Sequence, residues 1–392
     1  MEDLKRLACE AIDRQASRLR DVSSEIWMNP ELGFEEHRAH SLLTDLLGDA
    51  GFQVDKKFTL ETAFRAKSGT TKRPNVAIMC EYDALPNIGH ACGHNLIAEA
   101  GCAAGIGVKA ALESSDQSLG CVTVFGTPAE EGGNGKVKML SNGCFKDADI
   151  AMMAHPLNAD YLNRYSLALL ELDVTYKGKA SHAAAFPWEG INALDAAVMA
   201  YTNMSMMRQQ MKPTWRVHGI VTNGGIKPNI IPEESQLQYY IRAPTEGELK
   251  TLKCMSEKIF HSAAKATGCS VEIVEGEGCS NVLVNSVLAD AYCKNCASLK
   301  FDFKPPVAGG STDMGNISYA IPSIHPYFNV GTSASIHSQE FTAAANTDYA
   351  HERAISAGKA MAMTAIEILC VPELLPSIRT SFDTQVATAI SS

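Results

Sequence analysis

At 392 residues the chain is long enough for two domains with separate cores, and its composition, 46% hydrophobic and 20% charged, is typical of a globular enzyme. The net charge of −10 disfavours nucleic acid or an anionic membrane as the main partner. The first six residues contain no apolar core, no run is long enough to span a membrane, and twelve cysteines without a secretory signal predict free thiols in a reducing, cytoplasmic compartment.

The first half of the chain alternates between helical and strand patterns. Apolar side chains at helical spacing predict helices over 1–29, 35–47, 96–112 and 136–142. A polar turn is predicted over 67–74, and apolar runs predict strands over 52–55, 62–65, 76–80, 120–126 and 148–154. Because strands alternate with helices, we expect a mixed or largely parallel sheet covered on both faces, with ligands at the carboxyl ends of its strands.

From about Ser166 the pattern becomes that of a β-α-β-β-α-β unit with one exposed sheet face. Its predicted helices cover 190–211 and 246–267, and its predicted strands cover 170–176, 215–222, 235–242 and 270–274. Mixed α/β character resumes after it. We therefore expect an α/β fold in which a mixed-sheet catalytic domain, residues 1–165 and 281–392, is interrupted by an inserted α+β, ferredoxin-like lid domain, residues 166–280.

The segment 81–95 carries the densest set of reactive side chains. It lies between a buried strand and an Ala/Gly-rich helix, where free N–H groups and the positive end of the helix dipole favour a thiolate. Cys92 and His94 are two residues apart and flanked by glycines, which fits a thiolate–imidazole pair of metal ligands. A glycine-rich turn with two incidental polar residues is the competing interpretation.

Two adjacent acids, Glu130 and Glu131, follow the strand predicted at 120–126 and precede a glycine-rich turn. Neighbouring residues of an extended loop point in opposite directions, so one carboxylate can bind metal while the other faces an attacking water. Two acids in one pocket also need a cation, because otherwise the pKa of one of them rises strongly. A solvated acidic loop is the alternative.

Two histidines complete a possible ligand set. His155 comes directly after a buried strand, and His337 lies in the loop before the C-terminal helix. Each alone is more often a core or surface histidine. Together with Cys92, His94 and Glu131 they make five possible ligands at strand and loop ends, which suits two metal ions with open positions for water.

Further candidates lie outside this set. His182 follows the first strand of the inserted domain and could stabilise a developing oxyanion, and Arg242 ends another strand there and could hold a carboxylate in a forked pair. Backbone N–H groups around Gly310 could form an anion-binding nest. For these three, a solvated strand end or a simple loop is the alternative. Cys293 and Cys296 have redox or zinc-site spacing, although two unrelated helix cysteines are the better interpretation.

In this order, the motifs resemble the aminoacylase/carboxypeptidase G-type family of two-metal metallopeptidases over nearly the whole chain. The form Gly89-His-Ala-Cys-Gly-His94 is similar to the amidohydrolase subfamily, because a cysteine stands among the ligands. Within that subfamily, the β-alanyl-lysine dipeptidase branch is most similar in segments 80–86, 90–98, 187–197 and 208–219. The resemblance implies two divalent ions, zinc or manganese, and a homodimer formed through the lid domain.

The resemblance also implies roles for the residues of the site. Glu130 would be the general base, and Asp83 would steady an imidazole ligand. Cys92 would bridge the two ions. The full set of metal ligands would be Cys92, His94, Glu131, His155 and His337.

The lid would supply further groups by the same resemblance. His182 and Asn229 would come from the lid of the partner subunit. Arg242 and the loop at Gly310 would take the carboxylate of the substrate. No nucleic acid or membrane partner is expected.

Three positions depart from the family's pattern. The broad family has His where Glu81 stands and Asp where Cys92 stands, and much of the amidohydrolase subfamily has Asp where Asn95 stands. The first two departures belong to this subfamily, since His94 can supply the displaced imidazole. Glu81 and Asn95 leave open which side chains support the ligands, and a soft thiolate leaves zinc and manganese as alternatives.

The expected activity is hydrolysis of an amide bond in a dipeptide or N-acyl amino acid, most closely a β-alanyl or γ-aminobutyryl dipeptide of lysine or ornithine. One alternative is the same chemistry on another N-acyl amino acid, an auxin-type conjugate or a natural product, or amide formation. Another is a non-catalytic binding or regulatory protein on the same fold. Such a protein need not keep every ligand, whereas all expected ligands and the base are present here.

Overall fold

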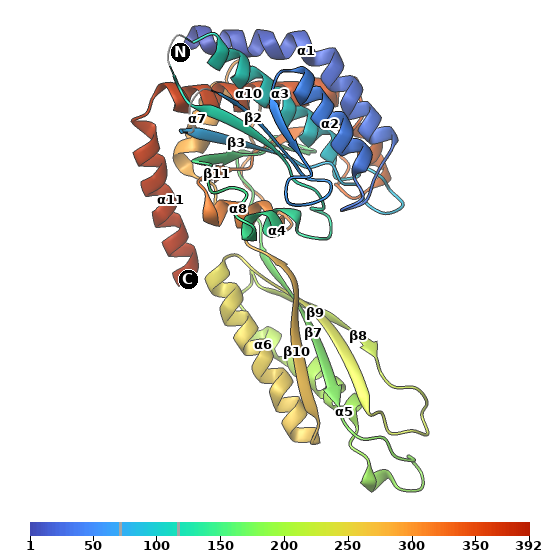
Figure 1. The fold of residues 1–392 in the computed structure, drawn as a ribbon. Coiled ribbons are helices and arrows are strands. Elements are labelled where there is room, and N and C mark those ends of the chain that lie inside the picture. Colours follow the sequence, from blue (N-terminus) through green and yellow to red (C-terminus); the bar gives the residue numbers. More distant parts are fainter. Residues whose placement is uncertain (70–72, 116–117) are drawn as a thin grey trace. The chain divides into compact units, whose positions relative to one another are not determined.

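The computed structural model describes residues 1–69, 73–115 and 118–392, so part of the expected turn at 67–74 lies outside the described residues. The chain divides into two compact units, which are visible in Figure 1. Unit 1 is Met1–Tyr165 with Val282–Val386, and unit 2 is Ser166–Asn281 with Ala387–Ser392. The last six residues were expected in the catalytic domain, but they group with unit 2, where the hydroxyls of Thr245 and Ser392 lie 2.6 Å apart.

A six-stranded sheet with strand order β1-β2-β4-β3-β5-β11 forms the centre of unit 1. Its strands are β1 (Gln53–Lys56), β2 (Phe64–Gly69), β3 (Asn75–Cys80), β4 (Cys121–Gly126), β5 (Ile150–Met152) and β11 (Ser323–Ile324). The run β4-β3-β5-β11 is parallel, and the β1-β2 hairpin is joined antiparallel to β4. The predicted mixed α/β fold is therefore confirmed. Because β3 and β4 are buried along their whole length, their sequences are largely apolar, and the polar side chains of Asn75 and Thr123 pair with each other, the hydroxyl donating to Oδ1 at 2.9 Å.

Helices cover both faces of this sheet. On one face, α2 (His37–Asp49), α3 (His94–Glu113) and α7 (Ser286–Cys296) pack against the sheet, and α1 (Glu2–Met28) and α10 (Asp348–Cys370) pack on α3 in the same core. The other face packs against α4 (Gly135–Ser141) and α8 (Met314–Ala320). Two further helices follow in the C-terminal part of the chain, α9 (Gln339–Ala344) and α11 (Leu374–Ser391).

Helix α3 lies between α1 and α10 and approaches the sheet closely. A Cβ on Gly101 would lie 2.4 Å from the Cys80 sulfur, so only glycine allows this approach. Contrary to the expectation that no run is long enough, α3 has the length and apolar composition to cross a membrane. However, 83% of that apolar window is buried inside the structure, as expected of a core helix. Among the described residues, α10 and α11, which are bent against each other, would give a second candidate span only if the two helices together formed a single broken span.

The strand expected at 148–154 is shorter in the structure. β5 ends at Met152, and His155 begins a separate strand, β6 (His155–Leu157), which pairs in parallel with β12 (Tyr327–Asn329). His155 is therefore the first residue of a strand rather than a loop residue after one. The apolar run conceals this break, because both strands are buried.

Unit 2 contains a four-stranded antiparallel sheet with the order β10-β7-β9-β8. Its strands are β7 (Ala168–Lys177), β8 (Arg216–Asn223), β9 (Glu234–Ala243) and β10 (Ser270–Cys279), and its main helices are α5 (Ala193–Met207) and α6 (Glu246–Thr267). Both helices pack on the sheet in one core, which explains the alternating burial along β9.

Two elements expected in unit 2 have different bounds in the structure. The helix expected at 190–211 begins at Ala193, because the Asn192 side chain caps it by accepting from the N–H groups of Leu194 and Asp195, and it ends at Met207, where a short 3-10 helix (Arg208–Gln210) follows. β10 continues to Cys279 rather than ending at Val274. Helix α6 has the expected bounds.

Candidate metal centre

The predicted ligands come from segments that leave one edge of the sheet in unit 1. β3 and β4 are parallel neighbours, with Cys80 opposite Gly126, so the segments after both strands start at the same edge. The Thr127 N–H and hydroxyl both donate to the Cys80 carbonyl, at 2.8 and 3.0 Å, and hold the two exits together. The acids at 130–131 are therefore held beside the segment that carries Cys92 and His94.

Gly93 brings β6 to this edge. It precedes α3 with a φ of 75°, and a Cβ at this position would lie 2.6 Å from Pro156 Cγ. Both the positive φ and the close approach require glycine. As a result, the Cys92 sulfur and His155 Nε2 lie 3.4 Å apart.

The five predicted ligands converge in two overlapping groups. Donor atoms of Cys92, His94 and His155 lie within 4.8 Å of one another, and so do donor atoms of Cys92, Glu131 and His337. Cys92 is common to both groups. Such an arrangement can hold two cations that share one sulfur.

Hydrogen bonds orient the imidazoles of the first group. His94 Nδ1 lies 2.9 Å from Asp83 Oδ1, and His155 Nδ1 lies 2.7 Å from the Pro156 carbonyl. Since both partners are acceptors, each Nδ1 carries a proton and each Nε2 is left for a cation. Asp83 also accepts from the Glu131 N–H at 2.9 Å, so it connects the two halves of the site.

His337 is placed by its backbone. Its N–H donates to the Ala91 carbonyl at 2.8 Å, and its φ is 65°, a left-handed conformation that is uncommon for a residue other than glycine. Its Nε2 lies 3.2 Å from Glu131 Oε1. A residue 245 positions after Cys92 in the sequence is thus fixed to the same segment.

The charges at the site, together with polar atoms left unpartnered in the described structure, favour the binding of a cation. Burial, followed by the charges of Glu81 and Glu131, raises the pKa of Glu130 well above its usual value. Burial also raises the pKa of Glu131, but the imidazoles of His337 and His94 bring it below its ordinary value. The buried atoms His94 Nε2 and Glu81 Oε2 have no hydrogen-bond partner among the described residues. A sulfur, imidazole nitrogens and carboxylates gathered at this spacing, two of them buried and, in the described part of the chain, without a hydrogen-bond partner, fit a divalent ion.

Loading the protein with Zn²⁺ near neutral pH is expected to release protons. Burial, the largest effect, raises the pKa of the Cys92 thiol, so the metal-free thiol is protonated. Burial, the largest effect, lowers the pKa of His94, but Asp83 and Cys92 together raise it well above its ordinary value, so this ring is an imidazolium before metal binds. Both must lose a proton to act as ligands, and affinity therefore rises with pH. Calorimetry in buffers of different ionisation enthalpy measures the number released; zero would contradict this charge assignment.

One buried carboxylate that supports the site was missed from the sequence. Glu36 is 0% exposed, accepts from the Ala129 N–H at 2.8 Å and accepts from the Thr62 hydroxyl at 2.7 Å. Ala129 has a φ of 58°, so Glu36 holds the strained turn immediately before Glu130. Glu36 follows another glutamate in the sequence, and no pattern there distinguishes it from a solvated residue.

His182 and Asn229 are neighbours within unit 2. The Ala183 N–H donates to the Asn229 carbonyl at 3.1 Å. His182 Nδ1 accepts from the N–H groups of Ala184 and Ala185, at 3.2 and 3.1 Å. The proton of a neutral ring is therefore on Nε2, which can serve as a donor, and the side chain is exposed.

The structure does not bring Arg242 to these two residues within unit 2. Arg242 pairs with Leu169 at one end of β7 and β9, whereas Lys177 and Glu234 pair at the other end. His182 lies beyond that other end, since the Ile231 N–H donates to the Ser181 carbonyl. Eight residues of strand separate the two ends by about 26 Å.

Gly310 lies in unit 1, in an exposed loop with open space around its Cα. The neighbouring Gly309 N–H donates to the Tyr165 carbonyl at 2.9 Å, so it is already used. On α7, Cys293 is exposed and Cys296 is buried. Neither cysteine belongs to a candidate metal group in the part of the chain that the structure describes.

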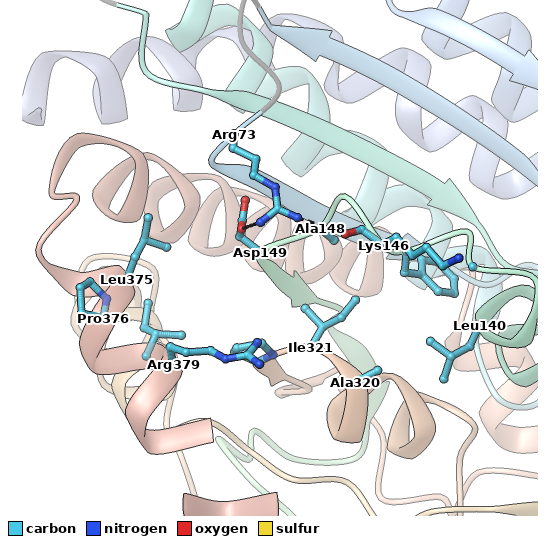
Figure 2. A pocket seen from close by; sticks show the side chains of 14 residues that line it. Arg73, Leu140, Lys146, Ala148, Asp149, Ala320, Ile321, Leu375, Pro376 and Arg379 are labelled. Carbon is cyan, nitrogen blue, oxygen red and sulfur yellow. Dashed lines mark hydrogen bonds and ion pairs between the residues drawn. The ribbon is translucent and has the colours of Figure 1, made fainter. Parts of the chain in front are cut away.

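A cavity of about 710 Å³ in unit 1 is separate from the metal centre. Figure 2 shows Arg73, Asp149 and Arg379 around it. Arg73 donates to Asp149 Oδ1 at 2.9 Å, and Arg379 lies 3.2 Å from Asp383, so both guanidinium groups already have counter-ions. None of the predicted site residues lines this cavity.

Comparison with known proteins identifies a matching family model, related sequences and a related structure. Residues 168–268 match a family model described as a peptidase dimerisation domain. The sequence is 49% identical to the Xaa-Arg dipeptidase of Mus musculus, over 97% of this chain and 93% of that protein. It is 30% identical to a p-aminobenzoyl-glutamate hydrolase subunit of Escherichia coli K12, over 96% of this chain and 94% of that protein. A dinuclear metal-binding peptidase from the M20 family of Bacillus subtilis has a similar fold, with a TM-score of 0.70 at 19% identity, covering 90% of this chain and 99% of the other.

Proposed function

The chain belongs to the M20 family of metallopeptidases, which are metal-dependent hydrolases of peptide bonds, and from this premise we propose that it is a two-metal dipeptidase for substrates with a cationic carboxyl-terminal residue. The named activity of the mouse relative is towards Xaa-Arg. The branch that the motifs resemble acts on lysine and ornithine dipeptides. A cationic side chain after the scissile bond is common to both.

The observation that carries this proposal is the convergence of the five donors on Cys92, beside the carboxylate of Glu130. Divalent ions held there, zinc or manganese, would polarise the scissile carbonyl and acidify the attacking water. Glu130 Oε2 lies 3.9 Å from His94 Nε2 and its side chain is 12% exposed, so it borders the centre and can be reached. In the proposed reaction Glu130 takes the proton of the water and passes it to the leaving amine.

The lid is proposed to act from a second copy of the chain. The Nε2–H of His182 would donate to the oxyanion, with Asn229 beside it, and Arg242 would bind the substrate carboxylate. His182 and Arg242 lie at opposite ends of a sheet about 26 Å long, whereas a dipeptide, with two extended residues, spans only about 7 Å. One copy of unit 2 therefore cannot offer both groups to one dipeptide. A homodimer satisfies both roles.

A panel of dipeptides tests the substrate class. We expect turnover of β-alanyl-lysine, β-alanyl-ornithine and alanyl-arginine, with kcat/KM at least about tenfold above that of alanyl-leucine, because binding of the cationic group is worth more than about 1.4 kcal/mol. Mass spectrometry of the two amino acid products measures each rate. Equal rates across the panel would refute the cationic preference.

Hydrolysis of an N-acyl amino acid remains the second candidate, because a 30% identical relative is named a p-aminobenzoyl-glutamate hydrolase. Including p-aminobenzoyl-glutamate in the panel separates the two. A non-catalytic regulatory protein would bind metal without turning over any member. Cytoplasmic location stays a prediction from the cysteine content and the N-terminal sequence.

The proposed dimer is expected to form through the β8 edge. β8 is an edge strand of the unit 2 sheet, and Ile220 and Val221 on it are 59% and 45% exposed. Unpaired strand edges with apolar side chains pair readily with another copy. Ile220→Lys should convert the dimer to a monomer in light scattering and reduce kcat/KM at least about a hundredfold, since an oxyanion donor is lost. Val274→Lys, which changes a 51% exposed residue on the opposite edge strand β10, is the matched control and should remain dimeric.

A further inference from the structure

A fully buried lysine, Lys136, lies beside the metal centre in the first turn of α4. Its ammonium group contacts Glu81 Oε1 and lies 2.7 Å from Asp313 Oδ1, and all three side chains are 0% exposed. Its backbone N–H also donates to Asp313 Oδ2 at 2.9 Å. Asp313 therefore holds both the backbone and the side chain of Lys136, and Lys136 fixes one oxygen of Glu81.

The other oxygen of Glu81 faces the metal centre. Glu81 Oε2 lies 3.5 Å from His94 Nε2, and neither atom has a hydrogen-bond partner in the described part of the chain. A buried polar atom without a partner is unfavourable unless something binds it. Two donors at about 2.1 Å from one tetrahedral cation lie about 3.4 Å apart. The spacing of these two atoms is that of donors to one ion.

Charge also favours a cation at this place. Glu81, His94 and Glu130 form a third group whose donor atoms lie within 4.8 Å of one another. Once His94 has lost its proton to act as a ligand, Lys136 supplies one positive charge to the cluster, whereas Glu81, Glu130 and Asp313 supply three carboxyl groups. Burial lowers the pKa of Lys136, yet Asp313 and Glu81 hold it well above its usual value, so the lysine stays charged. The cluster still has more acidic groups than cations.

We propose that Glu81 is a further donor to the cation held by His94, and that Lys136, anchored by Asp313, is the residue that positions it. The inference rests on the proposed two-metal function. Because Lys136 occupies Oε1, the carboxylate cannot rotate away, and Oε2 stays directed at His94. The competing explanation is a buried ion cluster that stabilises the fold and leaves cation affinity unchanged.

The test is cation binding by the whole chain, with Zn²⁺ alone and Mn²⁺ alone. Elemental analysis gives the number of ions per chain, and competition with a chelator gives their affinities. Glu81→Gln is expected to lower the affinity for one of the two ions at least about a hundredfold, at or above the upper limit for residues that only support a ligand, and to leave the affinity for the other unchanged. Rotation of the amide cannot restore a negative donor.

A matched variant separates this role from a structural one. Glu99 is 2% exposed and pairs with His351 at 2.7 Å, but among the described residues it belongs to no candidate metal group. Glu99→Gln should lower the melting temperature without changing cation affinity. The double variant Lys136→Met/Asp313→Asn removes one charge of each sign, and it should weaken the same ion as Glu81→Gln.

The outcomes are distinct. A folded Glu81→Gln protein with unchanged ion number and affinities overturns the inference while the proposed function stands. If Glu81→Gln does not fold, the double variant decides, and unchanged affinity in it overturns the positioning role and the inference. A wild-type protein that binds neither cation overturns the proposed function and this inference with it.

Discussion

Glu130→Gln is expected to reduce kcat about a thousandfold while the protein keeps its fold and its bound metal. Glutamine has the same shape as glutamate but cannot accept the proton of the attacking water, and a general base contributes a factor of about 10² to 10⁴. Glu130 groups with Glu81 and His94 but belongs to neither donor group that shares Cys92, and the variant leaves all of those donors in place, so the ions should stay bound. KM should change little, because the side chain acts in the transition state.

The measurement is steady-state hydrolysis of the best dipeptide of the panel, together with elemental analysis and circular dichroism. Glu352→Gln, an exposed change on α10, serves as the control and should retain full activity. A Glu130→Gln protein with more than a tenth of wild-type kcat would show that another group takes the proton. Loss of metal from this variant would instead show that Glu130 is a ligand.

Much of the fold follows from local patterns in the sequence. The apolar runs of β3 and β4 predict buried strands because parallel strands are covered on both faces, and their shared carboxyl edge predicts where ligands gather. The bounds of α6 agree with the prediction, and in the structure Thr245 caps the start of this helix and Gly268, with a φ of 79°, ends it. Such features depend only on neighbouring residues.

The residues that hold the site's side chains in place act instead through contacts between distant parts of the sequence, which local patterns do not predict. Glu36 meets Ala129 across 93 positions, and Lys136 meets Asp313 across 177. In the sequence each is an ordinary charged residue next to a turn. Similarly, the break between β5 and β6 is set by pairing with β11 and β12 far along the chain. The donors themselves could be proposed because their residue types and strand-end positions limit the choices.

Cys92→Ala is expected to affect both metal ions, whereas His155→Ala should affect only one. The Cys92 sulfur belongs to both donor groups, and His155 belongs only to the group with His94. Loss of a direct ligand should lower the affinity for an ion by at least about a hundredfold. This is at or above the upper limit of the effect of residues that merely support ligands. His155→Ala should therefore retain close to one ion per chain after dialysis, and Cys92→Ala close to none.

Thermal unfolding provides an independent measure of the same difference. An ion supplied at a hundred times its Kd stabilises the folded state by about 2.7 kcal/mol per site, so added Zn²⁺ should raise the melting temperature of wild type most and of Cys92→Ala least. Cys102→Ala, which truncates a fully buried cysteine on α3, controls for the loss of packing and should respond to Zn²⁺ as wild type does. If Cys92→Ala retained one tightly bound ion while His155→Ala lost both, His155 rather than the sulfur would be the shared ligand. Equal retention in all three variants would mean that the ions bind elsewhere.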